Sequence, residues 1–240
     1  MIITEQVEYN DSQNTFEGVV AYRKDTNADT PVVLIAHAYS GQSDFEKNKA
    51  IELAKLGYIG FAIDLYGKGK RAKTPAQAQE LMDHLNSNRT LLLQRMQLSL
   101  EQAKKLKFAD KTKLGAIGYC FGGKCVLDLA RSGEKLKGLV SFHGLYDAPR
   151  HNMKTKIKSP ILVMHGWNDP LAPPDDVVKL AKELTSKEAD WEMTAYGNTG
   201  HAFTNPMANS PENGLMYNQN ASNKAWNRMK LFFADAFDNG

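Results

Sequence analysis

Short, uninterrupted apolar runs alternate along the chain with longer stretches in which apolar positions recur at helical spacing. The apolar runs predict strands at residues 19–22, 32–36, 59–63, 113–119, 139–142, 161–165 and 191–196, the first of them antiparallel. The helical spacing predicts helices at residues 45–56, 89–106, 121–130, 176–185 and 222–236. Strands that alternate with helices are typical of parallel βαβ units. We therefore expect an α/β fold, with a mostly parallel central sheet flanked by helices on both faces.

Local signals support these elements and mark two loops. Gly57 follows the first predicted helix and is a natural C-terminal stop, and the helix at 89–106 carries Leu92, Met96, Leu100 and Ala103 on one stripe. Residues 67–73 contain four basic side chains, but a solvated loop is favoured over a phosphate or nucleic-acid site. Residues 199–214, rich in Asn, Gly and Pro, are predicted to be irregular.

Length and charge narrow the class of protein. A chain of 240 residues with 42% hydrophobic and 24% charged residues excludes a disordered tail, a coiled coil and a collagen-like fibre, and we expect a single domain over residues 1–240. The net charge of +3 disfavours nucleic acid or an anionic membrane as a partner. The chain has no apolar run of membrane-spanning length, and its start lacks the basic and apolar regions of a signal peptide. A soluble cytoplasmic protein, monomeric or homodimeric, is the expectation.

The sharpest motif is Gly-Tyr-Cys-Phe-Gly-Gly at residues 118–123, between a predicted strand and a predicted helix. It fits the G-x-nucleophile-x-G pattern, in which an abrupt strand-to-helix turn presents the nucleophile and small residues prevent collisions. Cys120 is the predicted nucleophile, because a helix N-terminus favours its thiolate, and the backbone N–H of Phe121 is a candidate oxyanion donor. A buried cysteine in a tight turn is the alternative. Cys125 is interpreted as a small buried apolar residue.

Other glycine-rich motifs do not fit this segment. A P-loop would require Ser or Thr after Gly123-Lys124, where Cys125 stands, and a dinucleotide-binding turn would lie in the first βα unit with full G-x-G-x-x-G spacing. The two cysteines have no C-x-x-C zinc or redox spacing, and no His and carboxylate motif predicts a metal site. We expect neither a metal nor a cofactor.

A thiol nucleophile needs a base and a group that orients the base. Among the six histidines, only His201 lies in a polar loop after the last predicted strand, and Asp169 follows the strand before it. The order Cys120, Asp169, His201 is the one expected for α/β-hydrolases. Asp147 is a minor alternative acid, Asp64 is expected to organise a loop, and His37 and His165 are expected to bond backbone near the site. The backbone N–H of Tyr39, in the loop after residues 32–36, is the predicted second oxyanion donor.

Taken together, these residues resemble the dienelactone hydrolase family of the α/β-hydrolase superfamily over nearly the whole chain. The resemblance is carried by Gly-Tyr-Cys-Phe-Gly-Gly at 118–123, Asp-Leu-Tyr-Gly at 64–67, His-Gly-Trp-Asn-Asp at 165–169 and Gly-His-Ala-Phe at 200–203. It implies a Cys120, Asp169 and His201 triad, with an oxyanion hole from Tyr39 and Phe121. Side chains at four positions are expected to line the substrate pocket, with packing as their alternative role: Ala38, Tyr66, Trp167 and Phe203.

Two departures from the family pattern bear on substrate and on the resting thiol. Ala38 stands where the family carries a glutamate paired with the thiol, and Asn205 stands where it carries an arginine that grips a substrate carboxylate. Asn cannot replace a bidentate clamp, so dienelactone itself is a doubtful substrate; Arg71, Lys73 and Arg89 are the candidate replacements. Without the glutamate, His201 alone is expected to draw the thiol proton.

The predicted function is cysteine-dependent hydrolysis of carboxylic esters or lactones through a thioester acyl-enzyme. Hydrolysis of neutral phosphotriesters by the same triad is the alternative within enzymes. A non-catalytic scaffold and a redox-sensing thiol protein are the alternatives from other classes.

Overall fold

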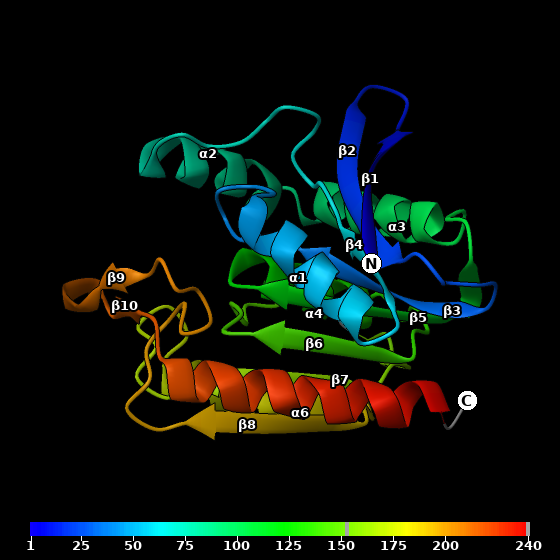
Figure 1. Ribbon diagram of the computed structural model, residues 1–240. Coiled ribbons are helices and arrows are strands. Elements are labelled where there is room, and N and C mark those ends of the chain that lie inside the picture. Colours follow the sequence, from blue (N-terminus) through cyan, green and yellow to red (C-terminus); the bar gives the residue numbers. More distant parts are fainter. Residues whose placement is uncertain (152–153, 239–240) are drawn as a thin grey trace. The chain divides into compact units, whose positions relative to one another are not determined.

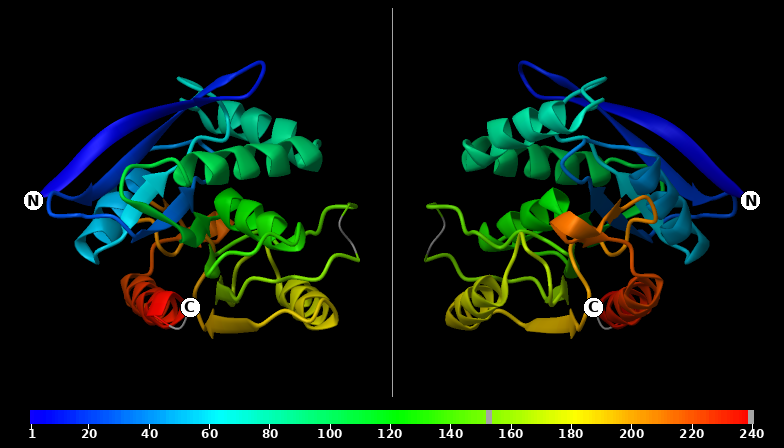
Figure 2. Two further views of the ribbon diagram at one scale, coloured as in Figure 1. Left: turned by 90° about the vertical axis from the view of Figure 1, so that its right-hand side faces the viewer. Right: turned by 90° about the vertical axis from the view of Figure 1, so that its left-hand side faces the viewer.

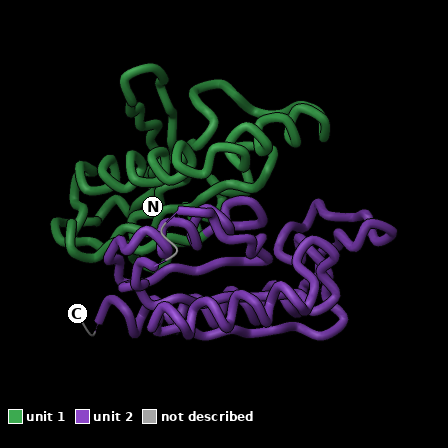
Figure 3. Tube along the Cα trace, turned by 180° about the vertical axis from the view of Figure 1, so that it is seen from behind, with its two compact units in different colours: residues 1–117 green, residues 118–240 purple. Residues whose placement is uncertain are grey.

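The computed structural model describes residues 1–151 and 154–238, and its chain falls into two compact units. Unit 1 comprises residues 1–117 and unit 2 residues 118–240 (Figure 3). The boundary lies within β5 (Ala109–Tyr119), two residues before Cys120. Each unit is described in turn.

Unit 1 is built on four strands in the order β1-β2-β4-β3, with antiparallel pairing of β1 with β2 and of β2 with β4. The pairing changes to parallel between β4 and β3, where Val32 faces Ile59 and Ile35 faces Ala62. β3 and β4 are almost entirely buried, as their apolar runs require. The strands span β1 (Ile2–Asn10), β2 (Thr15–Arg23), β3 (Thr30–Ala36) and β4 (Ile59–Ala62).

The helices of unit 1 are α1 (Asp44–Lys55), α2 (Pro75–Asn86) and α3 (Arg89–Ala103). α1 and α3 lie on opposite faces of the strands (Figure 2). A capping box starts α1, in which the Ser43 hydroxyl accepts from Phe45 N and the Glu46 carboxylate accepts from Ser43 N. Gly57, with φ of 96°, lies just past its end as the sequence predicts.

Unit 2 contains three neighbouring parallel strands, β6 (Gly138–Phe142), β7 (Ile161–Gly166) and β8 (Trp191–Tyr196). Its helices are α4 (Phe121–Arg131), α5 (Pro174–Ser186) and α6 (Gln219–Asp238). α4 packs on β6, while α5 and α6 lie on opposite sides of β8 (Figure 2). A small hairpin, β9 (Asn209–Ser210) and β10 (Leu215–Met216), lies on the side toward which β6 and β8 point (Figure 1).

The structure confirms the α/β class and each strand and helix predicted from the apolar pattern, with ends shifted by a few residues. The Leu92, Met96, Leu100 and Ala103 stripe of α3 is buried, and residues 67–73 form a loop. β1 and α2 are additional elements, for which the apolar pattern predicts neither a strand nor a helix. β1 has no apolar run because, as an outer strand, it buries only Tyr9 of its residues 2–10.

A buried charged cluster ties α4 to α5 within unit 2. Arg131, at the end of α4, is 1% exposed and forms ion pairs with Asp128 and with Glu183 of α5. Its guanidinium also donates to the carbonyl of Tyr146 at 2.9 Å. Each charge is compensated by partners, which is the condition for burying charges without a large net cost.

We therefore expect Arg131→Met to lower the free energy of unfolding by about 3–5 kcal/mol, because it leaves buried carboxylates without their cation. Lys156→Met is the matched control, since Lys156 pairs with Glu188 but both side chains are about two-thirds exposed. The control should change stability by no more than about 1 kcal/mol. Urea unfolding followed by circular dichroism measures both, and equal effects of the two substitutions would contradict the prediction.

Candidate active site

The predicted nucleophile lies at a sharp turn between β5 and α4. Cys120 has φ of 55° and ψ of −115°, a conformation that a residue with a side chain rarely adopts. Its backbone N–H donates to the carbonyl of Phe142 at 3.1 Å, which ties the turn to the end of β6. Part of Cys120 is accessible to solvent, whereas Cys125 is buried. The strained residue of the turn is therefore the cysteine that the sequence selects.

The glycines around Cys120 are required by close backbone approaches. A Cβ on Gly118 would lie 2.1 Å from the carbonyl oxygen of Gly122, and one on Gly123 would lie 2.6 Å from Ser141 Oγ and 2.8 Å from the backbone Cα of Gly144. Backbone atoms at such distances cannot yield without moving the turn. The G-x-C-x-G-G pattern thus follows from packing inside the elbow.

The predicted base and the predicted acid lie in loops that follow adjacent parallel strands. β7 and β8 pair in register up to Gly166 and Tyr196, so the loops after them begin side by side. A Cβ on Gly166 would lie 2.4 Å from the carbonyl oxygen of Gly200, the residue before His201. The backbone of His201 is held to the β9–β10 hairpin, where its N–H donates to Gly214 O at 2.8 Å.

These loops place the Asp169 carboxylate on the His201 imidazole. Asp169 Oδ2 lies 2.7 Å from His201 Nδ1, and Asp169 Oδ1 accepts from Leu171 N at 2.8 Å. Both side chains are almost fully buried. An ionised carboxylate only accepts hydrogen bonds, so Nδ1 carries a proton and Nε2 is the nitrogen left for proton transfer. Nε2 is buried and makes no hydrogen bond of regular geometry with a described residue.

Cys120 and His201 are electrostatically coupled. Burial lowers the pKa of His201, but the Cys120 thiolate and the bonded Asp169 raise it to about 10. Burial raises the pKa of the Cys120 thiol, but the charge of His201, their side-chain interaction and a hydrogen bond from Phe121 N–H bring it below its ordinary value. The two shifts have opposite signs, so each charge of a thiolate and imidazolium pair stabilises the other.

His143, the residue after β6, is a neighbour of this pair to which the sequence gave no role beyond its strand-end position. Its ring meets that of His201 in a T-shaped arrangement with centroids 5.1 Å apart, and its Nε2 lies 2.7 Å from Thr204 Oγ1. Its φ is 37°, which is unusual for a residue other than glycine. Burial, and then the charge of His201, lowers its pKa well below 6.5. The strand-end position was the available signal, whereas the contact with Thr204 depends on the folded loop.

The two alternative carboxylates, Asp64 and Asp147, bind other groups. Asp64, in unit 1, accepts hydrogen bonds from the backbone of Glu17, Tyr66 and Gly67, which is the loop-organising role that the sequence predicts. Asp147, in unit 2, forms an ion pair with Lys124 at 2.7 Å and has a 62% exposed side chain. Asp169 is thus the carboxylate found on His201.

Two further histidines differ in their partners. His37 bonds backbone as predicted, because Leu65 N donates to its Nε2 at 3.2 Å and its Nδ1 lies 2.7 Å from Ala38 O. His165 instead places Nδ1 3.0 Å from the Tyr146 hydroxyl, a side-chain contact rather than the expected backbone one.

The remaining predicted site residues lie in both units. In unit 1, the Tyr66 hydroxyl donates to the carbonyl of Tyr39 at 2.9 Å, and Ala38 N donates to the Glu46 carboxylate at 3.3 Å. In unit 2, Trp167 is 46% exposed directly after β7, consistent with a surface available to a ligand. Phe203 is fully buried, with its ring packed on those of His143 and Tyr196, so the contacts seen here are those of the packing alternative.

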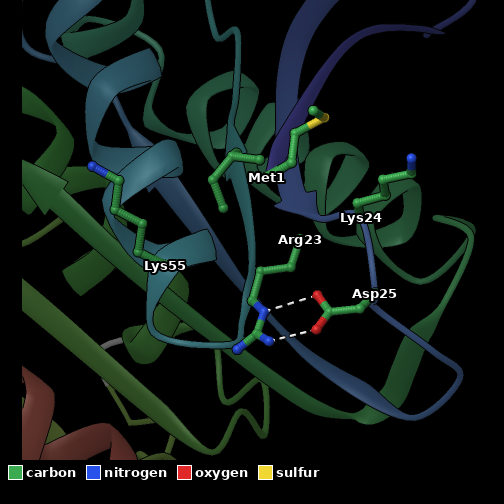
Figure 4. Close-up of a pocket in the computed structure, with 6 residues that line it drawn as sticks. Met1, Arg23, Lys24, Asp25 and Lys55 are labelled. Atoms are coloured by element: carbon green, nitrogen blue, oxygen red, sulfur yellow. Dashed lines mark hydrogen bonds and ion pairs between the residues drawn. The ribbon is translucent and has the colours of Figure 1, made fainter.

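A hollow on the surface of unit 1 is lined by residues other than the predicted site residues. A hollow of about 690 Å³ in unit 1 is lined by Arg23, Asp25 and Lys55 together with the N-terminal residues, and an Arg23–Asp25 ion pair crosses it (Figure 4). Within residues 1–151 and 154–238, no three His, Cys, Asp or Glu side chains are grouped as a metal site. None of the described helices is both long and apolar enough to cross a membrane.

Comparison with known proteins identifies the family. The model of the dienelactone hydrolase family matches residues 16–237. The chain belongs to this family. It is therefore a hydrolase of the kind that acts on ester bonds, as the sequence predicts.

Individual relatives agree with this membership. A protein of Yersinia pestis, provisionally named carboxymethylenebutenolidase, is 25% identical over 214 residues, covering 85% of this chain and 77% of that protein. The crystal structure of a dienelactone hydrolase-like promiscuous phosphotriesterase from metagenomic libraries superposes with a TM-score of 0.93 at 29% identity, covering 98% of both chains. A Klebsiella pneumoniae structure provisionally assigned as a dienelactone hydrolase shares the fold, with a TM-score of 0.82 at 22% identity over 98% of this chain and 99% of that one.

The elbow geometry predicts that Gly118→Ala damages both folding and Cys120. The added Cβ would overlap the Gly122 carbonyl, so we expect a loss of about 1–3 kcal/mol in unfolding free energy and slower alkylation of Cys120. Gly197→Ala is the matched control, because a Cβ there meets no atom of the described residues within 4 Å. It should stay within about 0.5 kcal/mol of the wild type, and a Gly118→Ala protein that behaves like it would refute the packing argument.

The electrostatics predict the pH dependence of Cys120 alkylation. Because the thiol pKa is lowered, the rate of reaction with iodoacetamide should fall at a lower pH than it does for an ordinary thiol. The apparent pKa should lie clearly below the ordinary value of about 8.5. His201→Gln removes the stabilising charge and should return it toward that value, whereas Cys125→Ala, at a buried position, should leave it unchanged. An ordinary thiol pKa in the wild type would count against the ion pair.

Proposed function

We propose that the chain is a cysteine-dependent hydrolase of carboxylic esters or lactones that acts through Cys120, His201 and Asp169 as one catalytic domain. The observation that carries the proposal is the 2.7 Å contact between Asp169 and His201 beside a strained, partly exposed cysteine at a helix N-terminus. Family membership supplies the reaction class, and the geometry suggests which atoms perform it.

In acylation, the Cys120 thiolate attacks the substrate carbonyl carbon and the C=O electron pair moves onto oxygen. Backbone N–H groups stabilise this oxyanion: Phe121 at the start of α4, and Tyr39, whose assignment rests on its sequence position after β3. When the tetrahedral intermediate collapses, the C–O bond of the leaving group breaks. The leaving alkoxide takes the Nε2 proton of the His201 imidazolium, which leaves a thioester on Cys120.

In deacylation, His201 acts as a base. Its neutral Nε2 accepts a proton from water as the oxygen attacks the thioester carbon, and the C–S bond then breaks to restore the thiolate and release the acid. Asp169 keeps Nδ1 protonated and stabilises the imidazolium in both half-reactions. This cycle uses only groups of the chain, water and the ester.

The charges of the described residues favour neutral over anionic substrates. Asn205 stands at the position of the family's carboxylate-binding arginine, and its side-chain oxygen accepts from Met207 N at 3.0 Å. Arg71, the first candidate replacement, is held in unit 1 by Asp64 at 3.1 Å and Gln42 at 3.3 Å. An uncharged acyl group therefore fits these residues better than a dicarboxylate.

A neutral phosphotriester is the second candidate substrate class. It is favoured by the likeness to the promiscuous phosphotriesterase, which covers 98% of both chains at 29% identity. The same thiolate would attack phosphorus, the phosphoryl oxygen would take the developing charge, and the leaving alkoxide would take the His201 proton. The two classes share the nucleophile, so they must be separated by substrate and not by mutation.

The test is stopped-flow release of p-nitrophenol from a short-chain p-nitrophenyl ester. A burst close to one equivalent, followed by slower turnover, is expected for the wild type, because a thioester forms before water removes it. Cys120→Ala should abolish both phases. Acid-quenched protein should carry one acyl group on the peptide that contains Cys120, detected by mass spectrometry.

Matched measurements distinguish the alternatives. Cys125→Ala should keep the burst, since Cys125 is buried in α4. A p-nitrophenyl phosphotriester, assayed with the same variants, shows whether the second class is used. Cys120-dependent turnover of the phosphotriester alone would replace the ester proposal. No Cys120-dependent turnover with either class, together with reversible oxidation of Cys120, would favour a thiol sensor.

A further inference from the structure

His143 is a buried imidazole beside the proposed base that the mechanism above does not use. It follows β6 directly, its backbone N–H donates to Met164 O at 2.8 Å, and the preceding carbonyl, that of Phe142, accepts from Cys120 N at 3.1 Å. The backbone around His143 therefore connects the cysteine elbow to the end of β7. Its ring is 2% exposed and lies among those of Tyr119, His201 and Phe203.

The bond from His143 reaches the loop that carries the base. Thr204 Oγ1, 2.7 Å from His143 Nε2, lies three residues after His201, and Ala202 between them has φ of 58°. Both Thr204 and His143 are buried, so water does not compete for this hydrogen bond. The His143 ring thus contacts the His201 ring directly. Through its hydrogen bond to the Thr204 side chain, it also holds the backbone turn that follows His201.

The other ring nitrogen of His143 indicates the form of the imidazole. Nδ1 is buried and makes no hydrogen bond of regular geometry with a described residue. A buried N–H without an acceptor is costlier and rarer than a buried lone pair without a donor. The favoured tautomer therefore carries its proton on Nε2 and donates it to Thr204 Oγ1. A neutral donor at this place leaves His201 as the positively charged partner of Cys120.

We propose that His143 is a positioning residue for the hydrolytic reaction: as a neutral hydrogen-bond donor to Thr204, it fixes the His201 imidazole against Cys120. This inference deepens the proposed function and rests on it. Misplacing a catalytic group by about 1 Å can cost roughly 100-fold in rate, so a bond that sets the ring's position is expected to act on kcat more than on KM.

The same geometry predicts an effect of acid. The groups that face His143 are His201 from the loop after β8, Tyr119 from the end of β5, Phe203 and Thr204, and Asp169 faces His201 from the loop after β7. A proton on His143 would place a second positive charge about 5 Å from the His201 imidazolium. Repulsion between the two charges therefore opposes protonation of His143 in acid while His201 is charged.

The experiment compares three variants of the full chain. His143→Phe keeps a ring but loses the donor, Thr204→Val loses the acceptor, and His143→Gln keeps an amide donor that cannot titrate. We expect the first two to lower kcat on the p-nitrophenyl ester by about 10- to 100-fold with little change in KM. They should also move the apparent pKa of Cys120 alkylation toward the ordinary thiol value. His143→Gln should recover most of the lost kcat, and its Cys120 alkylation should still fall at low pH, because the thiolate itself takes a proton there.

Thr199→Val is the matched control, because its hydroxyl accepts from Asn218 Nδ2 at 3.1 Å in the same loop but does not contact His143. It should leave the alkylation profile unchanged. The proposal is overturned if His143→Phe and Thr204→Val keep wild-type kcat and alkylation profile, or if Thr199→Val shifts the profile as much as Thr204→Val does. The alkylation measurement needs no substrate, so a protein that hydrolyses no ester but shows the predicted shifts would contradict the proposed function and not the role of His143.

Discussion

The hydrogen bond between Asp169 Oδ2 and His201 Nδ1, at 2.7 Å, is the interaction on which the chemistry proposed for this chain depends. It fixes the tautomer of His201 and so decides which nitrogen is available to move protons. It also constrains the fold, because two separate loops must approach closely enough to make it. That approach is possible because Gly166, at the end of β7, leaves room for the carbonyl of Gly200. The proposed base therefore requires the pairing of β7 with β8 and a glycine at position 166, where the two loops approach each other.

Burial keeps the neighbouring imidazoles neutral around this pair. Desolvation is the first cause of the lowered pKa of both His143 and His165, and the positive charge of His201 acts in the same direction. His201 is the exception, since the charges of Cys120 and Asp169 outweigh the burial that would otherwise neutralise it. One imidazolium among neutral histidines gives the thiolate a single fixed counter-charge. Such an arrangement is preorganised, because little has to reorient when charge moves during the reaction.

The sequence predicted the parts of the site that local rules control. Cys120, Asp169 and His201 each follow a predicted strand, and parallel strands bring their carboxyl ends to one edge, so the strand pattern places the three residues at the same edge of the sheet. β1 could not be found this way, because an outer strand buries few of its side chains and has no apolar run. The contact of His143 with Thr204 was equally out of reach. It depends on a turn in which Ala202 has a positive φ, and no residue type in that segment predicts such a turn.

The loop after His201 shows how one position can serve either substrate or fold. An arginine at position 205 would offer its guanidinium to a carboxylate, but Asn205 uses its side-chain oxygen on Met207 N and its own N–H on Ala202 O, at 2.9 Å. The backbone bond closes the turn that contains Thr204, and the side-chain bond closes the next turn, which ends at Met207. Asn is a favoured residue in turns because its short side chain bonds backbone two residues on. The side chain at position 205 thus stabilises the loop that follows His201 and Thr204. A loop stabilised in this way adds precision to the base and no positive charge to the pocket, which is consistent with a neutral substrate.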